Sequence, residues 1–329
     1  MHMRKSHRVS HRPSFSPSTI IREMDDLLFG KENVSQNSQQ KGNYNSRQSI
    51  TPQRTIIQPN LKYLSDILET LIQKQISSES MMTDLIHSGI SPTIRYKIVE
   101  WIITLCKHFS LMRSVMYSTI SLMDRCFQCM TIPKKQLQLI SAVSLWMCIK
   151  YHCPNLIGIN QIISECGESV SKEDFLQCEG EILESIKCNI NIPNVSDFIN
   201  LFEENMSCDQ PLLMLLWTLG DIQLQFSSFL RFQPSTIATA IILYSLNCLN
   251  RTFQNEIVSK LIYNENPKKL YYCIEEMHNV VTDLLKSKKH SVIEQTESGK
   301  FNQAKKWLSR ATLPEPSSFV HMISNDPFE

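Results

Sequence analysis

The sequence predicts an all-α protein built from two helical bundles. Apolar residues recur at helical spacing through most of the chain, and convincing strand-like alternation of apolar and polar residues is absent. Only 8 glycines occur in 329 residues, and the 14 prolines fall at the edges of helical patterns or in the tails. The length also suggests about two domains.

The helix expected to organise the first bundle spans residues 134–151. From Leu137 onward it is apolar on nearly every side, so other helices must cover it. Small residues such as Ser141 and Ala142 let neighbouring backbones approach closely. Lys150 is the only charge after the first turn, and we expect it at the edge of the bundle.

Four further helices complete this first bundle, which we assign to residues 91–193. The bundle helices are predicted over residues 93–109, 114–127, 134–151, 160–166 and 171–188. Ser91 before Pro92 suits an N-cap and the first helical position, and Ser171 with Asp174 forms a capping-box pattern. Residues 61–90 should form a preceding amphipathic helix and a linker.

The same plan is repeated over residues 194–286, which predicts a second bundle. Its helices are expected over residues 195–202, 211–226, 234–249, 255–262 and 267–286. Residues 287–329 form a polar C-terminal tail in which we assign no element, 301–308 included.

Residues 1–60 are predicted to be a disordered regulatory arm, apart from a possible short helix over 20–29. They are polar, hold nine Lys/Arg against four Asp/Glu, and cannot bury enough apolar surface to offset ordering. The tripeptide Lys31, Glu32, Asn33 is either a solvated charge run or a KEN degron. Thr51 precedes a proline and then Arg54, the pattern favoured by proline-directed kinases.

Composition excludes several classes of function. A net charge of +1 argues against nucleic-acid binding by the whole chain, and no apolar run is long enough to span a membrane. No P-loop, GxGxxG or HExxH motif occurs. The 11 cysteines lack disulfide-scaffold spacing, which favours a reducing compartment, nucleus or cytoplasm. The lone pair Cys126 and Cys129 does not make a zinc site, and we expect no metal or other cofactor.

Charged residues stand where apolar ones are expected. Glu179 lies on the apolar stripe of its helix and needs a partner if it is buried, for which Lys150 is the candidate. The alternative is that each is solvated, with Lys150 simply favoured at a helix end. Arg95 and Asp124 pose the same choice between a buried pair and two solvated charges.

These charged positions belong to segments that resemble the cyclin family. Residues 94–101 (IRYKIVEW) resemble the cyclin signature MRAILVDW, residues 123–127 (MDRCF) resemble IDRFL, and residues 149–151 (IKY) resemble SKY. The five hallmark positions of the first cyclin box are filled by Arg95, Asp124, Leu139, Lys150 and Glu179. Residues 63–67, 219–222 and 232–238 extend the resemblance to mitotic (A/B-type) cyclins over about residues 61–285.

This resemblance implies a tandem cyclin-box fold and a non-catalytic regulatory subunit of a cyclin-dependent kinase in the mitotic cell cycle. Lys150 and Glu179 would bond kinase backbone near its PSTAIRE-type helix, which would order that helix and the activation loop. The apolar residues implied to pack on that helix are Met147, Tyr151, Leu183 and Ile190. A degron in the arm would be read by the anaphase-promoting complex.

The resemblance also implies a substrate-docking patch on the first box. Its residues would be Ile94, Ile98, Trp101, Leu137 and Gln138. Lys97 replaces an isoleucine of the family pattern there, and its cation would disfavour the arginine end of an RxL-type ligand.

Other departures keep two alternatives open. His152 and Cys153 replace two acids, and Cys188 replaces a frequent phenylalanine at the expected kinase interface. A cyclin-fold scaffold without kinase activation is therefore one alternative. The other is a transcription factor resembling TFIIB, although residues 1–60 contain no cysteine for a zinc ribbon.

Overall fold

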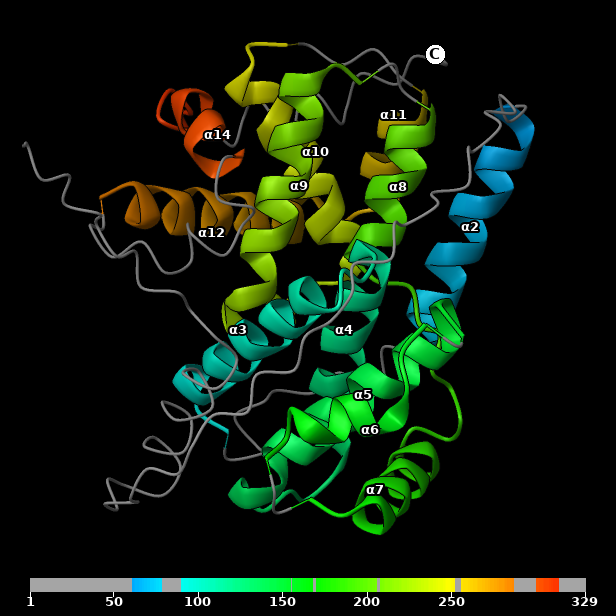
Figure 1. The fold of residues 1–329 in the computed structure, drawn as a ribbon. Coiled ribbons are helices and arrows are strands. Elements are labelled where there is room, and N and C mark those ends of the chain that lie inside the picture. The colour runs from blue at the N-terminus through cyan, green and yellow to red at the C-terminus, as the bar shows by residue number, and fades with distance from the viewer. Residues whose placement is uncertain are drawn as a thin grey trace, which may run out of the picture.

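The computed structural model describes residues 61–78, 90–154, 156–167, 170–205, 208–251, 256–286 and 300–313. Within these ranges every long element is a helix and no strand occurs (Figure 1). The all-α prediction is therefore confirmed. The expected short helix over 20–29, the KEN tripeptide and Thr51 lie outside the described residues.

The first bundle is assembled around α5 (Leu137–His152). Its other helices are α3 (Pro92–His108), α4 (Arg113–Cys129), α6 (Ile159–Ser164) and α7 (Lys172–Ser185), and α5 contacts all four. Nearly the whole of α5 from Ile140 to Ile149 is buried, as its apolar surface predicts. A 3₁₀ turn, η3 (Lys134–Gln136), replaces the predicted first turn.

The predicted N-caps of α3 and α7 are confirmed. Ser91 caps α3, its Oγ accepting from the Ile94 N–H at 3.3 Å. Ser171 and Asp174 form the expected capping box at α7, with Asp174 N–H to Ser171 Oγ at 3.0 Å. The predicted end of α7 at residue 188 is too late, because Lys187 and Cys188 adopt left-handed φ values of 53° and 57° that turn the chain.

The second bundle repeats the plan around α10 (Pro234–Cys248). Its other helices are α8 (Val195–Asn205), α9 (Gln210–Gln225), α11 (Glu256–Tyr263) and α12 (Pro267–Lys286). All four contact α10, which is buried over nearly its full length. A 3₁₀ turn, η4 (Ser227–Arg231), connects α9 to α10.

Two flanking helices pack on the second bundle. The N-terminal α2 (Leu61–Ser78) runs beside α8 (Figure 1), and its Gln75 side chain bonds Ser235, with Ser235 N–H to Gln75 Oε1 at 2.9 Å. The C-terminal α14 (Lys300–Leu308) lies against α9, with Ala304 and Leu308 buried. This last helix occupies a segment for which the sequence predicts no element.

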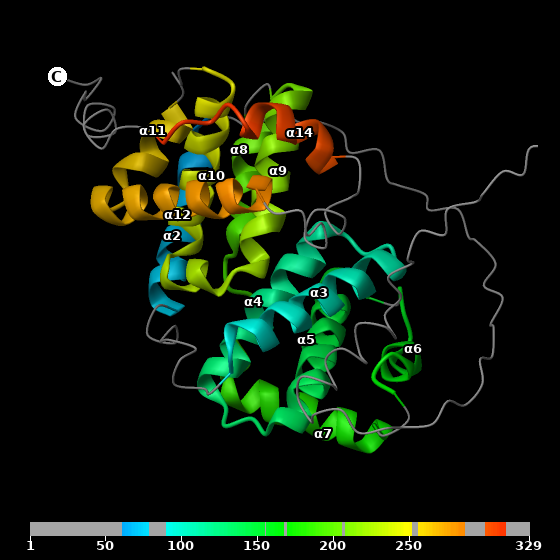
Figure 2. The ribbon, with the colours of Figure 1, turned by 90° about the vertical axis from the view of Figure 1, so that its left-hand side faces the viewer.

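The two bundles contact each other through helices of both (Figure 2). On the side of the first bundle, α3 contacts α9 and η4, and α4 contacts α8. Gly220 on α9 leaves room for the Tyr117 side chain of α4, because a Cβ at residue 220 would stand 2.5 Å from Tyr117 Oη. That hydroxyl donates to Asp221 Oδ1 at 3.0 Å, and Arg113 lies 3.3 Å from the same carboxylate. None of the helices in the described part of the chain combines the length and apolarity that a membrane crossing needs.

Candidate functional site

Lys150 and Glu179 form an ion pair on the outer surface of the first bundle. Lys150 comes from the last turn of α5 and Glu179 from the middle of α7. Their side chains are 44% and 14% exposed, so the pair faces solvent with its ammonium end more open than its carboxylate. The pairing predicted from Glu179's place on the apolar stripe is confirmed.

Local packing fixes Lys150 at this position. The C-terminal end of a helix favours a cation, and Lys150 occupies the last turn of α5. Its ammonium also lies 5.5 Å from the centroid of the Trp146 ring, within cation–π range. The helix end and the Trp146 ring both favour this position of the ammonium without burying it, so its remaining N–H groups stay open to solvent.

Apolar side chains around the pair are partly exposed. Tyr151 is 51% exposed, and its hydroxyl accepts from Asn191 Nδ2 at 2.8 Å. Leu183 and Ile190 are half-buried, whereas Met147 is buried. Leu176, which is 47% exposed one turn before Glu179, is absent from the predicted set. A leucine off the buried stripe of an amphipathic helix is the signal that could have found it.

The residues that depart from the cyclin pattern have defined places. His152 Nε2 lies 2.9 Å from Ser118 Oγ, and burial lowers the pKa of His152, with Asp197 acting in the opposite direction. Cys153 is half-buried, and Cys188 is exposed in the turn after α7. Neither cysteine is in a disulfide, and no described group of His, Cys, Asp and Glu side chains could hold a metal ion.

Arg95 and Asp124 form the second predicted pair, and both are buried. Arg95 Nε donates to Asp124 Oδ1 at 2.7 Å and Nη2 donates to Oδ2 at 2.8 Å, which is a bidentate geometry. The pair joins α3 to α4, so it is structural. Arg95 Nη1 is buried and has no hydrogen-bond partner among the described residues. Leu139, another hallmark position, is half-buried on α5.

The predicted docking-patch residues lie mostly beneath the surface. Ile98, Trp101 and Leu137 are buried, so they lie beneath the surface and do not line an exposed groove. Ile94 and Gln138 are half-buried. Lys97 Nζ lies 3.1 Å from the buried carboxylate of Glu100 on the same helix. The role of this patch stays a prediction.

The sequence profiles of two domains match this chain. The N-terminal cyclin domain matches residues 65–191, and the C-terminal cyclin domain matches residues 193–309. Together they account for most of the sequence and for both bundles. The chain belongs to the cyclin family, whose members are regulatory subunits of kinases rather than catalysts.

Plant cyclins are among its relatives. G2/mitotic-specific cyclin-2 of Medicago sativa is 24% identical over 195 residues, which cover 59% of this chain and 56% of that protein. Cyclin-B1-3 of Arabidopsis thaliana is 24% identical over 194 residues, covering 58% and 46%. The chain thus spans about half the length of these curated relatives. The solved structure of a viral cyclin from herpesvirus saimiri is 18% identical with a TM-score of 0.47, covering 73% of this chain and 98% of that one.

Proposed function

We propose that this protein binds and activates a cyclin-dependent protein kinase and acts in the mitotic cell cycle. The observation that supports this most is the solvent-facing Lys150–Glu179 pair, formed by two helices of a cyclin box. Two relatives whose names are G2/mitotic-specific cyclins support the mitotic part of the proposal.

The pair would act by hydrogen bonding rather than by chemistry. Lys150 can donate its remaining N–H groups to carbonyl oxygens of a partner, and Glu179 can accept from backbone N–H groups. Tyr151 and Leu176 would add apolar contact beside them. Because the two charges already neutralise each other, docking a partner there desolvates a pair rather than two isolated charges.

Activation would follow from a population shift in the kinase. A surface that binds only the active arrangement of the PSTAIRE-type helix and activation loop raises the population of that arrangement. The cyclin then supplies binding energy, and the kinase supplies every catalytic group.

The direct test is reconstitution with a purified PSTAIRE-type kinase. We expect a stable complex and stimulated phosphorylation of a histone-like substrate. A complex that forms without stimulation would favour the scaffold alternative, which His152, Cys153 and Cys188 leave open. Absence of a complex, together with a salt-dependent shift of duplex DNA, would favour a function like that of TFIIB.

A second proposal concerns the N-terminal arm, residues 1–60. We propose that the anaphase-promoting complex recognises its KEN tripeptide and so directs the protein to degradation. Changing Lys31, Glu32 and Asn33 to alanine should prolong the protein's half-life after mitosis, measured in synchronised cells. Unchanged decay would refute this use of the tripeptide.

Three further proposals concern phosphorylation of Thr51, subcellular location and binding of substrate peptides. Phosphopeptide mass spectrometry of dividing cells should find Thr51 phosphorylated, and imaging should place the protein in nucleus and cytoplasm.

For the docking patch, Lys97→Ile should strengthen binding of an RxL peptide, because it removes a cation near the peptide's arginine. Unchanged peptide affinity would contradict that role of Lys97.

A further inference from the structure

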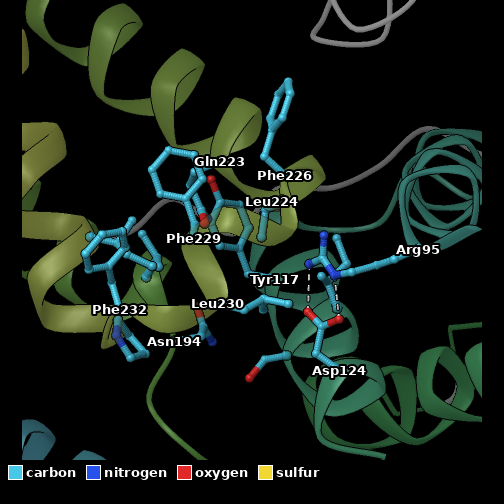
Figure 3. Close-up of a pocket in the computed structure, with 15 residues that line it drawn as sticks. Arg95, Tyr117, Asp124, Asn194, Gln223, Leu224, Phe226, Phe229, Leu230 and Phe232 are labelled. Atoms are coloured by element: carbon cyan, nitrogen blue, oxygen red, sulfur yellow. Dashed lines mark hydrogen bonds and ion pairs between the residues drawn. The ribbon is translucent and has the colours of Figure 1, made fainter. Parts of the chain in front are cut away.

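A pocket lies at the junction of the two bundles, and none of the proposed kinase-facing residues lines it. Its walls come from α3 and α4 on one side and from α8, α9, η4 and α10 on the other (Figure 3). The cavity volume is about 70 Å³, room for roughly five water-sized atoms. Ligand sites occur preferentially in such concave spaces between domains.

Most of the lining is apolar. The aromatic residues Phe226, Phe229 and Phe232 contribute from the second bundle, together with Leu230. Ile120 and Ser121 contribute from α4. An apolar group placed here would be removed from water, which is favourable in proportion to the area buried.

Two buried polar side chains in the lining have donors for which the described residues offer no partner. Arg95 is 2% exposed, and its Nη1 has no acceptor in the described part of the chain, whereas Nε and Nη2 both donate to Asp124. Figure 3 shows the nitrogen that is not bonded to Asp124 on the far side of the guanidinium from that carboxylate. Gln223 is 5% exposed, and its Nε2 likewise has no partner among the described residues. A buried donor without an acceptor is costly, so an acceptor in the pocket would be stabilising.

The charge around these donors selects the kind of acceptor. The positive charge of Arg95 is already matched by the bidentate carboxylate of Asp124. The Gln223 amide is neutral, and none of the other described residues that line the pocket is a cation. An anion would therefore lose its hydration without meeting a net positive charge, whereas a neutral carbonyl would not.

We propose that this pocket binds a small neutral molecule with an apolar body and a carbonyl oxygen. The oxygen accepts from Arg95 Nη1, and Gln223 supplies a second donor from the other bundle. The apolar body packs among the phenylalanine rings. Because the walls belong to both bundles, the ligand would join them and raise thermal stability.

The test uses three probes of the same shape and size. These are 3-methyl-2-butanone, which has a neutral carbonyl, isobutyrate, which is an anion, and 2,3-dimethylbutane, which has no acceptor. Each is titrated into the full-length protein while amide NMR signals are followed, those of the Gln223 side chain included. We expect saturable millimolar binding of the ketone, about tenfold tighter than the hydrocarbon, because one buried hydrogen bond is worth about that much.

Two variants separate the parts of the proposal. Gln223→Leu removes one donor and keeps the pocket apolar, and should weaken the ketone several-fold while leaving the hydrocarbon unchanged. Ser121→Leu fills the pocket from α4, a helix that can accept leucine, and should abolish binding of both. Thermal unfolding of each variant without ligand checks that it is folded.

Three results would overturn the proposal. Equal affinities for ketone and hydrocarbon would show that the donors are not used. Tightest binding of isobutyrate would show that the site selects anions. No saturable shift with any probe would show that ordered water alone satisfies Arg95 and Gln223.

Discussion

The two ion pairs of the first bundle have similar chemistry and opposite environments. Arg95 and Asp124 are both buried and bond in a bidentate geometry between α3 and α4. Lys150 and Glu179 meet at the surface, with the lysine side chain 44% exposed. A buried pair is costly to break, whereas an exposed pair contributes little to stability. The first pair therefore maintains the fold, and the second is available to a partner.

The largest effect is expected from breaking the buried pair. Arg95→Met leaves Asp124 buried without a partner, which should cost about 3–5 kcal/mol of unfolding free energy. Chemical denaturation of the variant and the wild type measures this. The double variant Arg95→Met, Asp124→Leu removes both charges and should recover most of the loss. A single variant as stable as the double one would contradict this account of the pair.

The junction between the two bundles should also be sensitive to side-chain size. Gly220→Ala places a Cβ against Tyr117 Oη, which is buried and bonded to Asp221, and should cost about 1–3 kcal/mol. Gly180 on α7 has open space around the position that an alanine methyl group would take, with no atom within 4 Å, so Gly180→Ala is the matched control. It should stabilise by about 0.5–1 kcal/mol. Equal effects of the two changes on the melting temperature would refute close packing at Gly220.

Breaking the exposed pair should change stability least among the charge variants. Lys150→Ala should alter the unfolding free energy by less than about 1 kcal/mol, because solvent screens the pair. Differential scanning calorimetry measures this. A loss as large as that of Arg95→Met would mean that the exposed pair also maintains the fold.

A small effect of pH on folding stability is expected from His152, which lies two residues after Lys150. Burial lowers the pKa of His152, so the unfolded chain binds that proton more readily than the folded one. Stability contributed by neutral His152 is present above its ordinary pKa and is lost as the pH falls through it, from about pH 7 to about pH 5. His152→Gln should flatten the stability curve over this range. Identical curves would contradict the assigned burial effect.

Helical periodicity was enough to predict both five-helix bundles. Glu179 on an apolar stripe and Lys150 on an otherwise apolar helix also predicted the pair that joins α5 to α7. Both inferences depend on local spacing, which is visible in the sequence. The capping residues of α3 and α7 were predictable for the same reason.

Contacts between bundles were not predictable in this way. The close approach of Gly220 to Tyr117 depends on how two surfaces fit, which no spacing along one helix encodes. The helix α14 was missed because few apolar residues in a polar tail mark its buried face. The pocket at the junction combines residues from six elements, so the donors that lack partners among the described residues emerge only in three dimensions.

The central claim is that the Lys150–Glu179 pair serves a partner and not the fold. Exchanging the charges, Lys150→Glu with Glu179→Lys, retains an internal ion pair and reverses the charges presented to a kinase. Affinity for a PSTAIRE-type kinase, measured by calorimetric titration, tests the claim beside the melting temperature of the variant. We predict a melting temperature close to that of the wild type and at least about thirtyfold weaker binding, the loss typical of a disrupted interfacial charge pair. Unchanged affinity in the exchanged variant would contradict the claim.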